Sequence, residues 1–383
     1  MTAARIHGFP YWPLAGFYFF YFAYLGAFAP YFSLYLNGIG LSAAAIGAVL
    51  ALPQVMRIFA AQYWAGLADR RGTRIVVARW AGFAGTAAFL PILAGDHLVL
   101  VVVTVAAMSY FWSAALPIAE VTTLGHLGTH FGRYGRVRVW GSIGFIAAVG
   151  GIGAALDHIP VTALPAIIAA LMATMLVFLW RVPEAPVAAG PHDETPLLAR
   201  LRDPDVIVLF VACALMAMAH GPYYTFFSIY LVELGYSKAA VGALWALGVA
   251  AEIVIFLVMP QLTRAFTLRT ILLVSFALAV VRFLLIAWGA QHLPLLLLAQ
   301  LLHAATFGTF HASALGLVQR LIAGRQQARG QAVYSSLTFG VGGTLGALGS
   351  GVLWEWLGPV GTFSLAAGCA ALGGAALAAR SRV

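Results

Sequence analysis

The pattern of apolar and polar positions along this chain is a series of long apolar runs separated by short polar segments. A helix that crosses a bilayer needs about 20 predominantly apolar residues. Because backbone polar groups in lipid have to be satisfied within the segment, these runs are predicted to be helices rather than strands. The pattern predicts twelve membrane-spanning helices, at about residues 12–36, 42–66, 74–94, 98–124, 137–156, 161–180, 206–232, 238–262, 270–289, 293–318, 330–353 and 358–379.

The composition fits a chain that lies in lipid. Hydrophobic residues make up 62% of the 383 residues and charged residues only 9%, whereas a soluble domain carries about 25% charged residues. So few polar side chains could not cover the surface of a soluble protein of this size. The basic residues behind the net charge of +9 stand singly or in small clusters between the apolar runs. This arrangement excludes a nucleic-acid-binding stripe.

The cysteines and the first apolar run exclude two other classes. Cys213 and Cys369 both lie inside apolar runs and have no C-x-x-C spacing, so the sequence supports neither a disulfide framework nor a zinc or haem site. The run from Tyr11 to Leu36 is too long for the core of a signal peptide and is not followed by a small-residue cleavage site. We expect it to be the first spanning helix, retained in the mature protein.

Arginine residues are distributed unequally between the two sides of the predicted helices. The loops on one side carry Arg70, Arg71, Arg74, Arg79, Arg133, Arg136, Arg181, Arg200, Arg202, Arg264, Arg269, Arg320, Arg325, Arg329, Arg380 and Arg382. The loops on the other side carry Lys238 and essentially no other basic residue. By the positive-inside rule, the arginine-rich side faces the cytoplasm. The sequence therefore predicts a multi-pass protein of the bacterial cytoplasmic (inner) membrane with both termini in the cytoplasm.

A polar segment divides the predicted helices six and six. Residues 181–205 are rich in proline, alanine and charge, and we interpret them as a cytoplasmic linker between an N-terminal half (1–180) and a C-terminal half (206–383). The halves are also similar in sequence, since residues 40–47 (GLSAAAIG) and 235–242 (GYSKAAVG) each precede or open the second helix of their half. Parallel repeats of six helices are a transporter architecture in which the substrate site lies between the halves.

Several ionisable residues interrupt the apolar runs. A charged side chain at the bilayer centre is costly, so such residues face a cavity or a partner and mark functional sites. Three arginines and two glutamates would leave a pocket with net positive charge, which favours an anion. The residues are Arg57, Glu120, Arg138, Glu252 and Arg282, together with the histidines His220, His303 and His311.

The loop between the second and third predicted helices resembles the loop signature of the major facilitator superfamily. The signature residues are Gly66, Asp69, Arg70, Gly72 and Arg74. The resemblance implies an all-α membrane protein with the major facilitator fold, twelve transmembrane helices in two six-helix bundles, and a gating role for these loop residues. The matching loop of the second half, residues 260–269, lacks the aspartate and the glycines. We expect any latch formed there to be weaker.

Further stretches are similar to the bacterial phenylpropionate transporter family and, more distantly, to the lactose permeases. The stretches are residues 134–142, 235–252, 281–282 and 301–307. The resemblance implies that Glu120, Arg138 and His303 bind the substrate. It also places Phe145 where the permeases have an aromatic residue that stacks on the sugar. For Glu120 and Arg138 a structural ion pair is the alternative, and for Phe145 simple packing is.

The same resemblance implies a proton-coupling network of Glu252, Arg282 and His303. Thr306 stands where the permeases have a further acid, so Glu252 or Glu120 would have to carry the proton. A fixed Glu252–Arg282 ion pair is the alternative reading. Arg57 matches Glu252 in the repeat and is expected to be an interdomain or cavity charge. We expect His220 and His311 to be packed or hydrogen-bonded structural residues.

These observations predict a secondary active transporter that moves a small organic solute, an aromatic or short carboxylate, by proton symport with alternating access. A sugar or nucleoside symporter of the same fold is the alternative. The sequence contains no Walker motif and no G-x-S-x-G pattern, which argues against an ATP-driven pump and a membrane-embedded enzyme. A channel fits less well than a carrier. We expect no cofactor or metal, and a monomer whose partners are the substrate, protons and the lipid bilayer.

Overall fold

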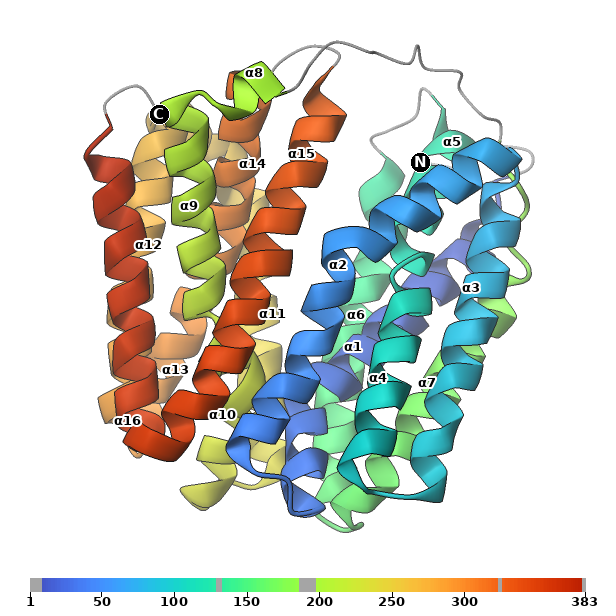
Figure 1. Ribbon diagram of the computed structural model, residues 1–383, viewed down its shortest axis with the longest axis horizontal. Coiled ribbons are helices and arrows are strands. Elements are labelled where there is room, and N and C mark those ends of the chain that lie inside the picture. Colours follow the sequence, from blue (N-terminus) through green and yellow to red (C-terminus); the bar gives the residue numbers. More distant parts are fainter. Residues whose placement is uncertain (1–8, 129–132, 186–197, 323–325, 381–383) are drawn as a thin grey trace, which may run out of the picture.

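The computed structural model describes residues 9–128, 133–185, 198–322 and 326–380, and in these residues it contains helices and no strand. The first group of helices comprises α1 (Tyr11–Gly38), α2 (Ala43–Arg71), α3 (Arg74–Phe89), η1 (Leu90–Ala94), α4 (Leu98–Trp112), α5 (Ala115–Leu127), α6 (Tyr134–Leu156), η3 (Val161–Ala163) and α7 (Leu164–Leu179). Figure 1 shows these helices side by side in one half of the molecule.

A second group of helices fills the other half (Figure 1). It comprises α8 (Leu198–Leu201), α9 (Pro204–Ala219), α10 (Gly221–Glu233), α11 (Lys238–Ala265), α12 (Leu268–Gly289), α13 (Leu293–His303), η4 (Ala304–Thr309), α14 (Phe310–Leu321), α15 (Gln327–Ser335), η6 (Ser336–Gly342) and α16 (Gly343–Ala378). Part of the predicted linker, residues 186–197, lies outside the described residues.

Eleven helical stretches of the described chain are long and apolar enough to cross a membrane. The last of them has 50 residues, and at about 1.5 Å per residue it is more than twice as long as the hydrocarbon core of a bilayer is thick. It turns back at Gly358, which has a φ of 63°, followed by Pro359 inside α16. Counting the two arms separately gives twelve crossings, so the predicted all-α fold is confirmed.

The repeated sequence motif forms the same local structure in both groups. Gly40 and Gly235 have φ angles of 82° and 91°, a left-handed conformation that favours glycine. Two residues later, the side chain of Ser42 accepts a hydrogen bond from Ala45 N–H, and that of Ser237 accepts one from Ala240 N–H. These serines are N-caps, and they fix the starts of α2 and α11.

The two groups touch most closely at the end of the molecule opposite to the start of α1 and the end of α16. We call this end the closed face and the other end the terminal face. Gly47 packs against Ala347 and Gly351, where an added Cβ would come within 2.6 Å of the Ala347 carbonyl oxygen. The hydroxyl of Tyr31 in α1 donates to the Lys238 carbonyl in α11 at 3.3 Å. Only small residues allow such close approach of helices.

Two acidic side chains cross between the groups at the closed face. Asp157, directly after α6, accepts hydrogen bonds from the backbone N–H groups of Lys238 (2.8 Å) and Ala239 (3.0 Å) at the start of α11. Glu355 of α16 accepts one from Ala44 N–H (2.9 Å) at the start of α2. Each group therefore supplies a carboxylate to a helix N-terminus of the other, where negative charge is stabilising.

Candidate functional site

The loop between α2 and α3 lies at the terminal face and is held by an ion pair. The Asp69 carboxylate lies 2.9 Å from Nη2 of Arg74 and also accepts a hydrogen bond from its Nε at 3.0 Å. Gly72 ends α2 with a φ of 65°, which explains the glycine there. Arg70 and Gly66 belong to the last two turns of α2, and Arg70 is exposed. The pair joins two helices of the first group.

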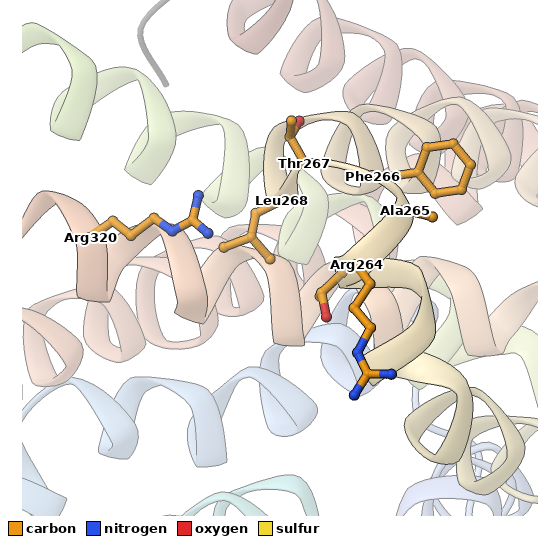
Figure 2. A pocket seen from close by; sticks show the side chains of 7 residues that line it. Arg264, Ala265, Phe266, Thr267, Leu268 and Arg320 are labelled. Carbon is orange, nitrogen blue, oxygen red and sulfur yellow. The ribbon is translucent and has the colours of Figure 1, made fainter.

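The matching loop between α11 and α12 has no such ion pair in the described residues. Instead, a pocket lies at this loop (Figure 2), lined by Thr263, Arg264, Ala265, Phe266, Thr267, Leu268 and Arg320. Its position at the terminal face separates it from the charged residues in the middle of the helices. The loss of the aspartate from this loop, which the sequence analysis noted, therefore coincides with the loss of the ion pair.

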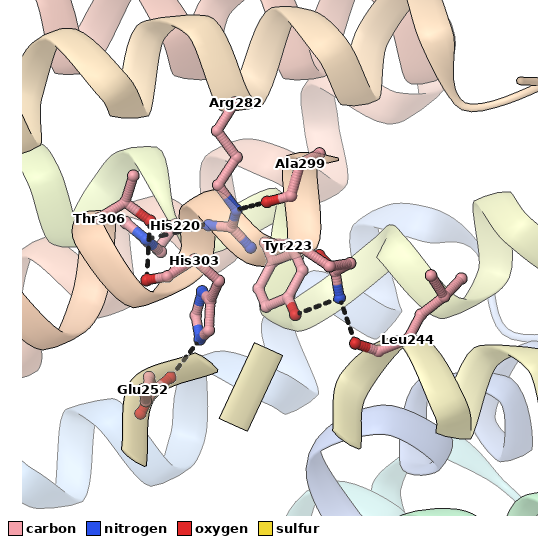
Figure 3. Close-up of polar contacts among 9 residues, drawn as sticks. His220, Tyr223, Leu244, Glu252, Arg282, Ala299, His303 and Thr306 are labelled. Atoms are coloured by element: carbon pink, nitrogen blue, oxygen red, sulfur yellow. Dashed lines mark hydrogen bonds and ion pairs between the residues drawn. The ribbon is translucent and has the colours of Figure 1, made fainter. Parts of the chain in front are cut away.

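Glu252 and His303 form the shortest ion pair in the described chain. Oε1 of Glu252, in α11, lies 2.7 Å from Nε2 of His303 at the end of α13 (Figure 3). The side chains are only 14% and 5% exposed. Nδ1 of His303 is buried and has no hydrogen-bond partner. The two side chains therefore share one proton between them, on either the carboxylate or the imidazole.

Arg282 lies next to this pair but is held by neutral groups. It is fully buried, its Nε donates to the Ala299 carbonyl at 3.1 Å, and its Nη1 lies 3.3 Å from both His220 Nε2 and Thr306 Oγ1 (Figure 3). The ring of Tyr223 lies 4.2 Å from the guanidinium carbon. No described carboxylate is within ion-pair distance of Arg282, so the alternative of a direct Glu252–Arg282 ion pair is not what the structure contains.

A row of rings leads from this pair towards the first group. His303, Phe307 and His311 follow one another at intervals of one helical turn, with ring centroids 5.6 Å and 6.3 Å apart. The ring of Phe339, in η6, lies 5.9 Å from that of His311, and the guanidinium of Arg57 in α2 lies 5.8 Å from the Phe339 ring. The sequence analysis missed Phe307 and Phe339. The four-residue spacing of 303, 307 and 311 was the available signal.

Two π-helical segments carry residues of this row. η4 begins directly after His303 and contains Phe307, and η6 contains Phe339. Single turns of π-helix are rare in proteins, and those that do occur are often found at functional sites. Their position here places the irregular parts of the second group next to its ionisable side chains.

Glu120 and Arg138 lie together in the first group, which fits both the substrate-binding interpretation and its ion-pair alternative. Arg138 Nε lies 3.9 Å from Oε1 of Glu120, with side chains 30% and 37% exposed, and the Tyr134 hydroxyl donates to the same oxygen at 3.3 Å. The rings of Phe22 and Tyr18 lie 4.0 Å and 5.7 Å from the guanidinium carbon of Arg138. Phe145 is partly buried and packs against the core, and no ring contact joins it to Arg138 in the described residues.

The sequence of this chain matches a known family and known transporters. The MFS_1 like family matches residues 11–365. A protein of Escherichia coli (strain K12) named "Probable 3-phenylpropionic acid transporter" is 31% identical over 360 residues, 91% of this chain and 92% of its own length. The "Maltose permease" of Geobacillus stearothermophilus is 28% identical over 88% of this chain and 86% of its own length.

A solved structure has the same fold. The crystal structure of the nucleoside transporter NupG superimposes with a TM-score of 0.87, covers 98% of this chain and 99% of its own, and is 18% identical in sequence. At this identity the likeness concerns the fold alone.

Proposed function

This chain belongs to the MFS_1 like family of major facilitator transporters, and from that premise we propose that it carries a small organic anion into the bacterial cell together with protons. The membership makes it a multi-pass membrane transporter of small molecules and not an enzyme. We propose that the anion is an aromatic or short carboxylate and that the membrane is the bacterial inner membrane.

The observation that carries the proposal is the balance of charge inside the membrane. Arg138 has Glu120 as its partner, and Glu252 has His303. No described carboxylate lies within ion-pair distance of Arg57 or Arg282. An unpaired positive charge at this depth is unfavourable unless a counter-charge comes from elsewhere. A transported anion is such a counter-charge. The 31% identity with the 3-phenylpropionic acid transporter supports a carboxylate that bears an aromatic ring.

We propose that Glu252 carries the coupled proton. It is nearly buried and contacts His303, a group that can accept or return a proton. Arg282 adds a permanent positive charge close by, held by His220, Thr306 and the Ala299 carbonyl. Loading of an anion and protonation of Glu252 would both change this charge balance. Their shared electrostatic environment links substrate binding to proton binding.

Alternating access would follow from rocking of the two helix groups as domains. The closest contacts between them lie at the closed face, where α2 meets α16 and α6 meets α11. With the arginine-rich terminal face in the cytoplasm, this structure would correspond to a state that is closed outwards. Both the domain motion and the orientation are parts of the proposal.

The test is uptake into liposomes that contain the purified protein. Radiolabelled 3-phenylpropionate is offered with and without an inward proton gradient, and Arg57→Ala, which removes one of the two arginines without a carboxylate partner, serves as the site variant. We expect saturable uptake that the gradient stimulates and that the variant loses. Uptake that is equal with and without the gradient would contradict symport.

A neutral substrate is the second candidate. The likeness to a maltose permease at 28% identity favours it, and a nucleoside belongs to the same class of polar, uncharged solutes. Maltose and uridine are therefore offered in the same assay. Gradient-driven uptake of either one, with none of the acid, would replace the anion by a neutral solute and leave the transporter in place.

A further inference from the structure

Arg57 is the central residue of the 29-residue helix α2, and its side chain is exposed. At this depth a charged side chain is tolerated when it faces a cavity or a partner. None of the ion pairs among the described residues, including that of Glu252, involves Arg57. Arg57 therefore forms no direct ion pair with Glu252, the residue that it matches in the repeat. The charge is open to a ligand.

The surroundings of Arg57 come from both helix groups. On the next residue of α2, Ile58 packs against Gly340 of η6, where an added Cβ would lie 2.6 Å from Ile58 Cγ1. One turn further, Gln62 donates to Ser336 Oγ at 3.1 Å. Arg57 itself faces the ring of Phe339, which lies between Ser336 and Gly340 in η6. The guanidinium thus lies where the first group meets the π-helical segment of the second.

Two further features connect this place with the centre of the molecule. Arg57 is within electrostatic reach of two tyrosines on other helices, the buried Tyr21 in α1 and the half-buried Tyr224 in α10. Behind Phe339 stands His311, whose Nδ1 is buried without a partner. Through Phe307 and His303 the row of rings ends at Glu252. An anion at Arg57 would lie at one end of this row, with Glu252 at the other.

We propose that Arg57 is the residue that binds the carboxylate of the transported anion, and that the ring of Phe339 supports the aromatic part from the opposite group. The proposal rests on the proposed function and deepens it by naming the residue that selects the carboxylate group of the substrate. The planar guanidinium can hold a carboxylate with two parallel hydrogen bonds. A ligand bound in this way bridges α2 and η6, so both groups sense its presence.

The test measures binding to the purified protein in detergent, where no gradient exists. Isothermal titration compares 3-phenylpropionate with its neutral analogue, 3-phenylpropionamide. We expect the wild type to bind the acid roughly tenfold more tightly than the amide, since a charge-assisted bidentate pair is lost with the amide. Arg57→Gln should bind the two compounds equally. Arg57→Lys should keep part of the preference for the acid, because lysine keeps the positive charge but cannot form the two parallel hydrogen bonds of a guanidinium group.

Two control variants separate this role from general damage. Arg79→Gln removes another arginine that stacks on a ring, that of Trp180 at 5.7 Å, within the first group alone, and it should keep the full preference. Phe339→Leu should weaken binding of the acid and the amide alike and keep their ratio. Size-exclusion profiles and melting temperatures show whether each variant is folded.

Three results would overturn the role of Arg57: a folded Arg57→Gln protein that still prefers the acid, a wild type that binds the acid and the amide equally, or tighter binding of uridine than of the acid in both proteins. These outcomes are distinct from a failure of symport. A preference for the acid in detergent, together with uptake that ignores the proton gradient, would keep the anion site and reject the proton coupling.

Discussion

Two histidines next to the central charges differ in what they can do with a proton. Nε2 of His220 faces Nη1 of Arg282 at 3.3 Å, and an arginine can only donate. Nε2 must therefore accept, so Nδ1 carries the proton and donates to the Met216 carbonyl at 2.9 Å. His220 is fixed in one neutral tautomer. His303 faces a carboxylate instead, so its proton can be exchanged.

This difference assigns the coupling to Glu252 and not to the arginine. In Glu252→Gln we expect gradient-driven uptake of 3-phenylpropionate to fall by roughly 5- to 150-fold, the usual range of coupling between two sites. Exchange of labelled for unlabelled substrate across the membrane should persist, because it requires no net proton movement. Uptake and counterflow in the same liposomes give both rates.

Glu233→Gln is the matched control, since Glu233 is an exposed carboxylate at the end of α10. Its uptake should equal that of the wild type. If Glu252→Gln loses exchange and uptake in the same proportion, the carboxylate serves substrate binding or folding, and another group carries the proton.

The sequence predicted which ionisable residues make up the site around Glu252, but it did not predict which of them contact one another. Ionisable residues within apolar runs are rare, so Glu252, Arg282 and His303 stood out. Which of them touch depends on the rotation of each helix, and a shift of one residue turns a side chain by about 100° and out of reach. The π-helical segments add to this, because η4 shifts the register directly after His303. Phe339 could not be singled out, because the chain has 25 phenylalanines and nothing in the sequence distinguishes this one.

At the scale of helices, glycine positions determine how closely neighbours pack. A Cβ at Gly144 of α6 would collide with the backbone of Phe19 in α1, so these helices touch backbone to backbone. Gly150 lies less than two turns further along α6 and has open space where its Cβ would be. The sequence shows both glycines alike, since the difference arises only from the face of the helix that meets α1.

We therefore expect Gly144→Val to separate α1 from α6 and to destabilise the protein by about 1–3 kcal/mol, the usual effect of overpacking. Gly150→Val should leave the melting temperature close to that of the wild type. Thermal unfolding in detergent, followed by tryptophan fluorescence, measures both. Equal melting temperatures for the two variants would show that α1 and α6 can move apart without a loss of stability.

The helix boundaries were the most predictable part of the fold. The lengths of the apolar runs could be read directly from the sequence, because the thickness of the bilayer sets how many apolar residues a spanning helix needs. The serines before α2 and α11 could be read as well, because a serine at this position forms a local hydrogen bond that caps the helix. The joined helix α15–η6–α16 was predicted as two separate spans, and its two arms do lie on either side of Gly358. How the two groups meet is a property of the whole molecule and has no local signal.

At the scale of the whole molecule, the closed face is held by a reciprocal pair of acidic caps. Asp157 and Glu355 occupy matching places, each near the closed-face end of its helix, and each caps the matching helix of the other group. Loss of a capping side chain to alanine costs about 0.5–2 kcal/mol. Because both caps exist only while this face is closed, their removal should favour the state in which it is open.

The double variant Asp157→Ala/Glu355→Ala tests this expectation. Spin labels at Ile159 and Leu357, which are 40% and 52% exposed near the closed face of different groups, report its width once Cys213 and Cys369 are replaced by serine. We expect the labels to move apart in the double variant. Asp203→Ala removes a cap that belongs to its own helix α9, and it should leave the distance unchanged. An unchanged distance in the double variant would show that the glycine contacts alone keep this face closed.

The caps also predict how the closed face responds to acid. Burial raises the pKa of Asp157, but hydrogen bonds from Ala239 and Lys238 N–H and from Ser237, with the charge of Lys238, outweigh it and lower the pKa. A depressed pKa means that the cap stabilises the closed face above the ordinary aspartate range, about pH 4, and is lost only as the pH falls through the lowered value. The label distance in the wild type should therefore stay constant from about pH 8 to pH 5 and widen only in stronger acid. Widening between pH 7 and 5 would assign control of this face to another group, because Asp157 stays ionised throughout that interval.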